Sequence, residues 1–318
     1  MESPNEAKTE LVLEAIRKRN QYKNQPDFYV QFCEQLNARN KYVNDADTMR
    51  IEFLFRAIQF QHEHVVDTLL SFPIDLESCQ YGGMDVVHQA MVSHTNHRII
   101  RKLLQKGANP DAIDTQGRTP LFYAVDRNDV ELVKVLLESG ADACKRDRFG
   151  QTPLHWSTHI LNTFTNDGVC LNLLLNVVDT VNVIDNEGQT PLHCASRRGN
   201  PAQVQALIQA GADVNLQNRI GNTPAHELVQ NLFPDFVSCV DSDEFKTLLL
   251  LIRAGADLDK EDRFGKTVYD LLKEADLTDF YELCLMESYR LDKEHLLDYA
   301  DDFALEEIVL ADNPPHRL

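Results

Sequence analysis

The chain repeats one short frame, a tight turn that ends in glycine and is followed two residues later by threonine, at intervals close to 33 residues. The last position of the frame falls at Asp85, Thr119, Thr152, Thr190, Thr223 and Thr267. Successive intervals are therefore 34, 33, 38, 33 and 44 residues. A fixed period of this length predicts a stack of small structural units, each of which buries its apolar face against its neighbours.

Each period carries the same parts in the same order. The letters T-P-L-H are complete at Thr152–His155 and Thr190–His193, and paired aliphatic residues followed by G-A-D come later, as in Leu136–Asp142 and Leu207–Asp213. Threonine caps a helix and proline suits its first position, whereas glycine favours the left-handed conformation that ends a helix. Each period is therefore predicted to form a turn, a helix, a second turn and a second helix.

These motifs resemble the ankyrin repeat family over Glu52–Tyr281. The resemblance implies an all-α fold, an ankyrin-repeat α-solenoid of about six repeats plus a C-terminal capping repeat, with short β-hairpin-like turns along one edge. It also implies a concave face built by those turns and the first helix of each repeat. In the last copy, T-V-Y-D-L-L-K at Thr267–Lys273, we expect Asp270 to replace the small residue of the inner helix.

The repeat frame divides the chain into three regions. Residues 1–51 are predicted to form a helical N-terminal cap, residues 52–281 the ankyrin repeat domain, and residues 282–318 an acidic C-terminal helix or tail with ten acids against three bases. That last region is either a solvated end or a docking or autoinhibitory segment. Two repeats are lengthened between their helices, and Phe233, Pro234 and Phe236 in the second insertion either form a secondary contact patch or fold back and pack.

Composition limits the classes of partner and the compartment. A net charge of -19 argues against binding to nucleic acid or to an anionic membrane, since both depend on Lys and Arg, and the apolar runs are too short for a membrane helix. The N-terminus shows no secretory signal, and the seven cysteines are scattered without a C-x-x-C pair. We therefore expect a soluble, monomeric protein with reduced thiols, with the cytoplasm as its main compartment and the nucleus as a second one.

The sequence offers no set of catalytic, cofactor or metal residues. Phosphate-loop, dinucleotide, G-x-S-x-G and H-E-x-x-H motifs are all missing, so we expect no enzyme activity, no cofactor and no metal site. The recurring histidines are predicted to make a structural hydrogen bond to a neighbouring turn, which the family resemblance implies; they are His88, His155, His193 and His226. Asn215 lies in a segment, L-I-Q-A-G-A-D-V-N, that resembles ankyrin turns modified by asparaginyl hydroxylases.

The positions that the repeat frame leaves exposed carry the predicted partner surface. Among 19 such positions eight are basic and two are acidic, although the whole chain is strongly acidic. Arginine beside aromatic residues is typical of binding hot spots. The predicted contact residues are Arg118, Tyr123, Arg127, Arg148, Phe149, Trp156, Arg197, Arg198, Arg219, Ile220, Arg263 and Phe264. For Tyr123 and Trp156 the alternative is partial burial between repeats.

We therefore predict a non-enzymatic scaffold or adaptor that binds another protein, through an acidic or phosphorylated segment with apolar anchors. The acidic C-terminal region is a possible internal occupant of the same surface. The alternatives are a substrate-recognition adaptor of a ubiquitin ligase, for which the segment around Cys284 lacks the flanking leucine and aliphatic residue, and a microbial or viral effector. The letters D-R-F-G occur at Asp147–Gly150 and Asp262–Gly265, which indicates either one partner that contacts both turns or shared ancestry of the two repeats.

Overall fold

The computed structural model describes residues 44–72, 74–76, 80–81, 84–93, 97–159, 168–232, 242–277, 280–282, 284–287 and 289–290. These residues fall into two compact units, an N-terminal unit that ends at Ile160 and a C-terminal unit that begins at Leu161. Several predictions fall outside the described residues: most of the N-terminal cap, the patch of Phe233, Pro234 and Phe236, and nearly all of the acidic C-terminal region. The boundary predicted after residue 51 lies inside the first described helix.

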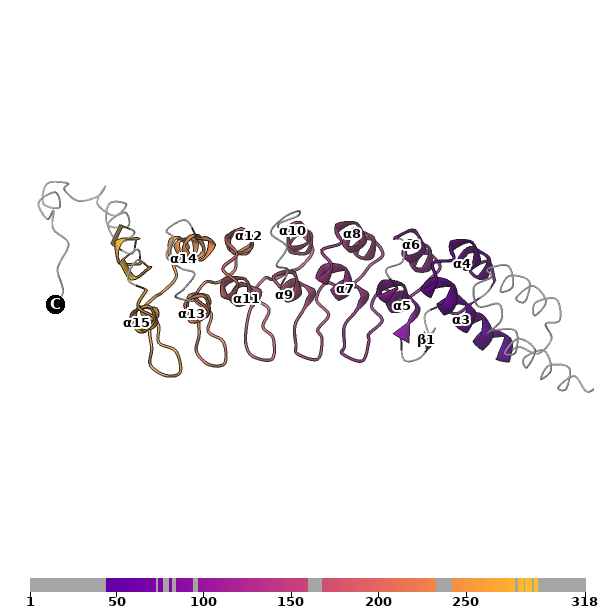
Figure 1. Ribbon diagram of the computed structural model, residues 1–318, viewed down its shortest axis with the longest axis horizontal. Helices are drawn as coiled ribbons and strands as arrows, with labels where there is room; N and C mark the ends of the chain where they lie inside the picture. The colour runs from indigo at the N-terminus through magenta and orange to yellow at the C-terminus, as the bar shows by residue number, and fades with distance from the viewer. Residues whose placement is uncertain are drawn as a thin grey trace, which may run out of the picture. The chain divides into compact units, whose positions relative to one another are not determined.

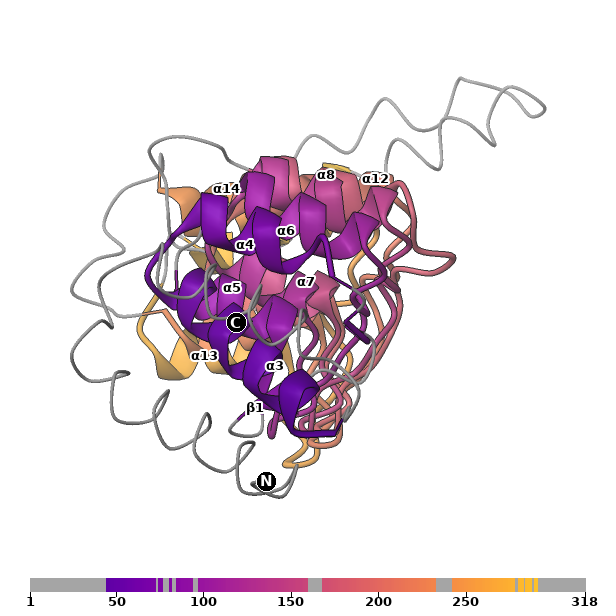
Figure 2. The same ribbon diagram turned by 90° about the vertical axis from the view of Figure 1, so that its right-hand side faces the viewer.

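The N-terminal unit consists of helix pairs in two layers. Its first helices α3, α5, α7 and α9 lie in one layer and its second helices α4, α6 and α8 lie in the other, as Figures 1 and 2 show, and the connecting turns project from one edge. A two-residue antiparallel pair, β1 with β2, pairs Gln80 with Asp85 and Tyr81 with Met84. The elements are α3 (Asn44–Gln59), α4 (Glu63–Leu69), β1 (Gln80–Tyr81), β2 (Met84–Asp85), α5 (Val86–Val92), α6 (His97–Gln105), α7 (Pro120–Asp126), α8 (Val130–Glu138) and α9 (Pro153–Ser157).

The C-terminal unit continues the same pattern of helix pairs. Within it α11, α13 and α15 pack on one another in one layer, and α10, α12 and α14 form the other layer (Figure 1). The elements are α10 (Val169–Leu175), α11 (Pro191–Arg197), α12 (Pro201–Gln209), α13 (Pro224–Gln230), α14 (Asp243–Arg253) and α15 (Val268–Glu274). No helix in the described ranges is long and apolar enough to cross a membrane.

The first helices α7, α9, α11 and α13 begin where the sequence predicts, with threonine at the N-cap followed by proline. At α11 the Oγ1 atom of Thr190 accepts a hydrogen bond from the backbone N–H of His193, and the Nδ1 atom of His193 accepts one from the backbone N–H of Thr190 at 3.1 Å. The other ring nitrogen, Nε2, then donates to the carbonyl of Asn222 in the next repeat at 3.0 Å. The predicted bond to a neighbouring turn is also present for His88 and for His226.

The last repeat differs from its prediction at Asp270. This residue occupies the position of the repeat histidine and not that of a small helix residue, since its Oδ2 atom accepts hydrogen bonds from the backbone N–H and the hydroxyl of Thr267 at 3.0 and 2.8 Å. A carboxylate serves this cap because it needs only to accept bonds. It cannot donate to a further repeat as Nε2 of histidine does, which suits the last unit of a stack.

Apolar side chains that face the neighbouring helix form the core of each unit. Aliphatic residues of α5, α7 and α8 are almost completely buried in the N-terminal unit, and residues of α11, α13 and α14 in the C-terminal unit. The core of the N-terminal unit includes Leu54, Ile58, Val87, Met91, Leu103, Leu121, Phe122 and Leu136, and that of the C-terminal unit includes Leu171, Leu192, Leu207, Leu228, Leu248, Leu251, Leu272 and Phe280.

Candidate protein-interaction surface

The turns that begin each repeat are closed by one side chain. In the last turn the Oδ1 atom of Asp262 accepts hydrogen bonds from the backbone N–H groups of Phe264 and Lys266 at 2.8 and 2.9 Å, and the backbone of Asp262 bonds across to Lys266. The same pattern occurs at Asp114, Asp147, Asp185 and Asn218. The two residues that follow the turn residue lie at the outer end of the turn, and nearly all of them are exposed. We call these two residues the tip of the repeat.

Within each unit neighbouring tips are joined by backbone hydrogen bonds. In the N-terminal unit the N–H of Arg148 donates to the carbonyl of Gln116 at 2.9 Å. In the C-terminal unit the N–H of Arg219 donates to Glu187 at 3.0 Å and the N–H of Arg263 donates to Ile220 at 2.9 Å. The tips of a unit therefore form one continuous edge.

The predicted contact residues Arg118, Tyr123 and Trp156 lie together in the N-terminal unit. The guanidinium of Arg118 forms an ion pair with Asp114 at 2.8 Å, donates to the Tyr123 hydroxyl at 2.8 Å, and lies 4.7 Å from the Tyr123 ring and 5.7 Å from the Trp156 ring. The Nε1 atom of Trp156 donates to Asp147 at 3.3 Å. All three side chains are half-buried. The arginine of this cluster is already paired with the carboxylate of Asp114.

The hydrogen bond between Tyr123 and Asp114 shifts both groups. Burial, with the hydrogen bond to Asp114, raises the pKa of Tyr123 to about 12. Burial also acts to raise the pKa of Asp114, but hydrogen bonds from Tyr123 and Arg118 outweigh it and lower that pKa. Asp114 is therefore a charged, fully bonded acceptor at neutral pH.

The two other arginines predicted in the N-terminal unit differ in their surroundings. The guanidinium of Arg127, at the C-terminus of α7, donates to the backbone carbonyl of Met91 and so joins two helices. Arg148 lies at a tip, where its guanidinium is 4.7 Å from the ring of Phe149. Phe149 remains 54% exposed.

In the C-terminal unit Arg197 forms an ion pair that the sequence analysis did not predict. Its Nε atom lies 2.8 Å from Glu227, whose side chain is only 5% exposed. Two amides complete this site, since Asn218 and Asn222 donate to Glu227 Oε1 at 2.8 and 3.1 Å. The charge of Arg197 is therefore compensated within the protein.

The site at Glu227 is one case of a pairing that recurs along the repeats. The turn residue contacts the residue nine positions later, which lies in the first helix: Asp114 accepts from Tyr123, and Asp147 accepts from Trp156. At Asn218 the direction is reversed, because the amide donates to the carboxylate of Glu227. The available signal in the sequence was the simultaneous change of a turn Asp to Asn and of an aromatic residue to Glu.

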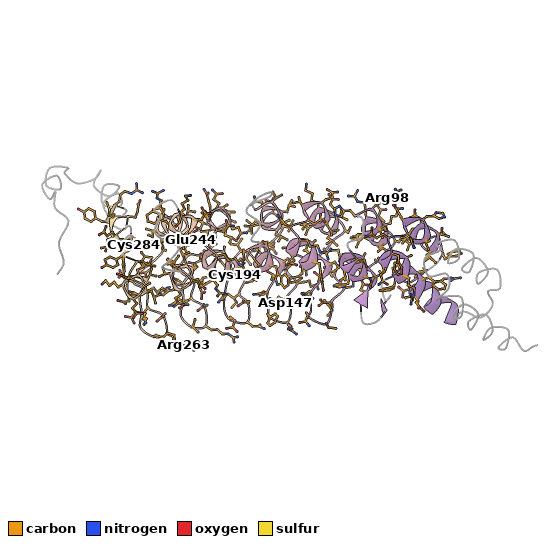
Figure 3. The ribbon with its side chains drawn as sticks, viewed as in Figure 1. Arg98, Asp147, Cys194, Glu244, Arg263 and Cys284 are labelled. Atoms are coloured by element: carbon orange, nitrogen blue, oxygen red, sulfur yellow. The ribbon has the colours of Figure 1, made fainter. Side chains whose placement is uncertain are left out.

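The other predicted arginines of the C-terminal unit, Arg198 at the end of α11 and the tip residues Arg219 and Arg263, are exposed. Among the described residues none of these three guanidinium groups has a carboxylate partner, and that of Arg263 donates to the backbone carbonyl of Arg219. Arg263 lies at the outer end of its turn in Figure 3, away from helix α11, which contains Cys194. The adjacent tip residues Ile220 and Phe264 are 41% and 74% exposed.

Asn215 joins two repeats through its side-chain amide. Its Oδ1 atom accepts from the backbone N–H of Asp257 at 2.7 Å, and its Nδ2 atom donates to the carbonyl of Gly255 at 2.9 Å. Asn182 makes the equivalent contacts to Asp213 and Gly211 one repeat earlier, and the sequence analysis did not single it out. Hydroxylation of Asn215 stays a prediction.

The Cys194 thiol of α11 is poorly suited to act as a nucleophile. Burial raises the pKa of the Cys194 thiol to about 12 and lowers the pKa of the adjacent His193. A thiol of that pKa is protonated at neutral pH and is a weak nucleophile. Within the described ranges no three His, Cys, Asp or Glu side chains are grouped as metal ligands would be.

Comparison with known proteins identifies the repeats. A family model described as ankyrin repeats (3 copies) matches residues 54–147, 87–163, 141–218 and 163–262. The B-cell lymphoma 3 protein homolog of Mus musculus is 29% identical over 161 residues, which cover 50% of this chain and 27% of that protein. The ankyrin repeat protein OPG189 of Variola virus is 34% identical over 179 residues, which cover 56% of this chain and 24% of that protein.

The fold is shared with solved structures. The crystal structure of the ankyrin repeat domain of Bcl-3, described as a unique member of the IkappaB protein family, superposes with a TM-score of 0.58 at 23% sequence identity. The superposition covers 69% of this chain and 92% of that domain. The chain thus spans about a quarter of the length of the curated relatives it matches, and most of the solved repeat domain.

Proposed function

The chain belongs to the ankyrin repeat family, and on this premise we propose that it is a non-enzymatic scaffold or adaptor that binds an acidic or phosphorylated segment of a partner protein. The observation that carries the proposal is the edge of the C-terminal unit, where two neighbouring tips each present an arginine followed by a large apolar residue. These pairs are Arg219 with Ile220 and Arg263 with Phe264. Arginine supplies bidentate contacts to carboxylate or phosphate, and the apolar residue supplies buried area.

Charge compensation favours this edge over the other predicted residues. Arg118 and Arg197 are paired with Asp114 and Glu227, so an incoming anion would compete with a carboxylate that is already bound. Arg127 donates to the carbonyl of Met91 from a half-buried position, whereas Arg263, which also donates to a carbonyl, is exposed. The contact surface proposed from sequence therefore narrows to the tips of the C-terminal unit, with Arg198 nearby in the chain.

The proposed compartment is the cytosol or the nucleus. Among the described residues Cys194 and Cys284 are buried free thiols. Free thiols persist in a reducing compartment.

The test is a charge reversal at the two tips of the full-length protein. Arrays of twelve-residue peptides of random sequence, with and without phosphoserine, are probed with the wild type and with the Arg219→Glu/Arg263→Glu variant. The wild type should select peptides rich in Asp, Glu or phosphoserine beside an apolar residue, and the variant should lose that selection. The matched control, Arg101→Glu/Lys246→Glu, makes the same change of charge on the outer helices α6 and α14, where both side chains are exposed and paired. Equal peptide selection by the tip variant and the wild type would contradict the proposal.

A further inference from the structure

The tips of the C-terminal unit form two parallel rows of different chemistry. One row contains Arg219 and Arg263, and the other contains Ile220 and Phe264, one residue further along each tip. The rows are held in register because the N–H of Arg263 donates to the carbonyl of Ile220 and the guanidinium of Arg263 donates to the carbonyl of Arg219. A partner that lies along this edge therefore meets one arginine and one apolar residue at each of the two tips. We call each such pair a step.

The spacing of the steps follows from the construction of the turns. Each turn is a narrow finger whose two arms are joined by a backbone bond such as that from Asn218 to Asn222, and it is bonded sideways to the next finger. Backbone segments joined by such bonds lie about 4.7–4.9 Å apart in sheets, so we take equivalent residues on successive two-armed fingers to be about 9–10 Å apart. A bound segment must present equivalent side chains at that interval to use both tips.

One extended conformation has this interval as its natural repeat. A polyproline II helix has three residues per turn and rises about 3.1 Å per residue, so residues three apart lie on one face about 9.3 Å apart. A β-strand repeats its face every two residues, about 6.6–6.8 Å, and does not match. An α-helix would need seven residues, about 10.5 Å, and helical ligands bind in apolar grooves, whereas the tips form a ridge.

Resting on the proposed function, we infer that the partner segment binds the C-terminal tips as a polyproline II helix with an acidic residue at every third position and an apolar residue next to it. Two of the three faces of such a helix contact the arginine row and the apolar row. The third face points to solvent, where proline is favoured because it stabilises the conformation before binding. The bound group is an oxyanion on a peptide, either a carboxylate or a phosphate.

The first tip of the C-terminal unit limits the number of tips that the bound segment can contact. It presents Asn186 and Glu187 where the next two tips present arginine and an apolar residue, so it offers neither contact. The inferred segment therefore uses two acidic–apolar steps. Changing this tip with Asn186→Arg/Glu187→Leu should add a third step to the edge.

The experiment compares labelled peptides by fluorescence anisotropy with the full-length protein at low salt. The matching peptide is three copies of Asp-Leu-Pro, and the comparison peptide contains the same nine residues with the acids two apart. Further peptides replace each Asp by phosphoserine or by Asn. A helical peptide with acid–apolar pairs seven apart tests the alternative conformation.

We expect the matching peptide to bind about tenfold or more tightly than its permutation, because each apolar anchor and arginine contact at a hot spot is worth about tenfold. The Asn version should not bind, phosphoserine should bind at least as well as Asp, and Ile220→Ser/Phe264→Ser should weaken binding about tenfold or more. Arg148→Glu/Phe149→Ser, on a single tip of the N-terminal unit, should change nothing. The three-step variant should bind the matching peptide more tightly than the wild type.

The outcomes separate this inference from the function on which it rests. Equal binding of the two permutations, tighter binding of the helical peptide, or no measurable binding of the matching peptide would overturn the inferred conformation. If acidic peptides still distinguish the wild type from Arg219→Glu/Arg263→Glu in those cases, the proposed function survives. If they do not, both fail.

Discussion

At the scale of single residues, the reversed pair of Asn218 and Glu227 shows how one position constrains another nine residues away. The turns at Asp114 and Asp147 use a carboxylate that accepts from a hydroxyl or an indole in the first helix, whereas this turn uses an amide that donates to a buried carboxylate. Two facing carboxylates would leave one charge without a donor in a poorly solvated site. Asn at the turn is therefore required by Glu in the helix.

Replacement of Asn218 by Asp tests this constraint. The new side chain can still accept both turn hydrogen bonds, as Asp does in the other repeats, so the expected loss arises from repulsion and from the missing donor. We expect the free energy of unfolding to fall by about 2–4 kcal/mol at neutral pH. The measurement is chemical denaturation monitored by circular dichroism.

The control for this change is Glu227→Gln. Its amide can donate to the carboxylate that Asn218→Asp introduces, in the polarity used by Trp156 and Asp147, so Asn218→Asp should cost much less in the Glu227→Gln background. Equal costs in both backgrounds would mean that the two side chains are not coupled.

Buried histidines and a buried carboxyl predict opposing pH dependences. Burial lowers the pKa of His193 and His226 below the ordinary 6.5, so below about pH 6.5 the unfolded chain binds protons that the native state excludes, and stability falls. Burial raises the pKa of Asp85 from 3.8 to about 6, so between those values the native state binds the extra proton, and this contribution increases as the pH falls.

The variant Asp85→Thr separates the two contributions. It removes the carboxyl group of Asp85, and with it the contribution that opposes the histidines. It also supplies a hydroxyl to Nδ1 of His88, a buried atom without a hydrogen-bond partner among the described residues. We expect higher stability at pH 7.5 and a steeper loss between pH 6.5 and 5 than in the wild type. The denaturation midpoint measured across this range gives the result, and parallel curves for the two proteins would contradict the assignment.

At the scale of elements, the identical letters D-R-F-G produce two different tips. The guanidinium of Arg148 lies over the ring of Phe149, whereas that of Arg263 donates to the carbonyl of Arg219 on the preceding tip and leaves Phe264 74% exposed. The turn geometry is the same, since Asp147 accepts the same pair of bonds as its counterpart. The neighbouring finger therefore affects the side-chain arrangement that the local sequence leaves open.

The close contact between neighbouring fingers makes Gly221 a sensitive position. Its φ is +81°, and an added Cβ atom would lie 2.7 Å from the backbone nitrogen of Arg263. We expect Gly221→Ala to lower the free energy of unfolding by about 2 kcal/mol or more, because left-handed backbone costs about 1–2 kcal/mol and the fingers must also separate. Thermal and chemical denaturation measure the loss.

The matched control for this change is Gly211→Ala. That glycine has a φ of +87° and nothing within 4 Å of an added Cβ atom, so it isolates the cost of the left-handed conformation. A cost at Gly211 equal to that at Gly221 would show that contact between fingers adds nothing. Gly221→Ala should also weaken binding of acidic peptides, whereas Gly211→Ala should not.

At the scale of the whole molecule, the net charge of -19 opposes folding and makes the basic tips exceptional. Salt screens charges that are about 10 Å apart or more at 0.1 M ionic strength. Raising NaCl from about 20 to about 300 mM should therefore raise the Tm of the full-length protein, because repulsion within the native state decreases.

Salt should have the opposite effect on binding. The same increase should weaken capture of an acidic peptide, because the attraction to Arg219 and Arg263 is screened. Differential scanning fluorimetry and peptide anisotropy on one salt series measure both effects. A Tm that falls with salt, or peptide binding that is insensitive to it, would contradict this account of the charge distribution.

The sequence by itself determined the parts of this protein that depend on contacts within a few residues. The period, the helix starts at Thr-Pro, and the exposure of the two residues after each turn Asp all follow from bonds that span two to four residues. Both partners of such a bond lie within a few residues of each other, so a short stretch of sequence is enough to predict it. The helix pairs and the exposed tips were therefore predictable, and the family follows from the same letters.

Only the tertiary structure decided which of the predicted arginines remain available. The pair of Arg197 with Glu227 spans 30 residues, and the bond from Arg127 to Met91 spans 36, so both depend on how one repeat stacks on the next. Frame positions mark these arginines as exposed but do not show which group of the adjacent repeat faces them. Arg118 pairs with Asp114 of its own turn, and Arg198, Arg219 and Arg263 have no carboxylate partner among the described residues. Stacking engages Arg127 and Arg197 with groups of the adjacent repeat, a fact that no single period contains.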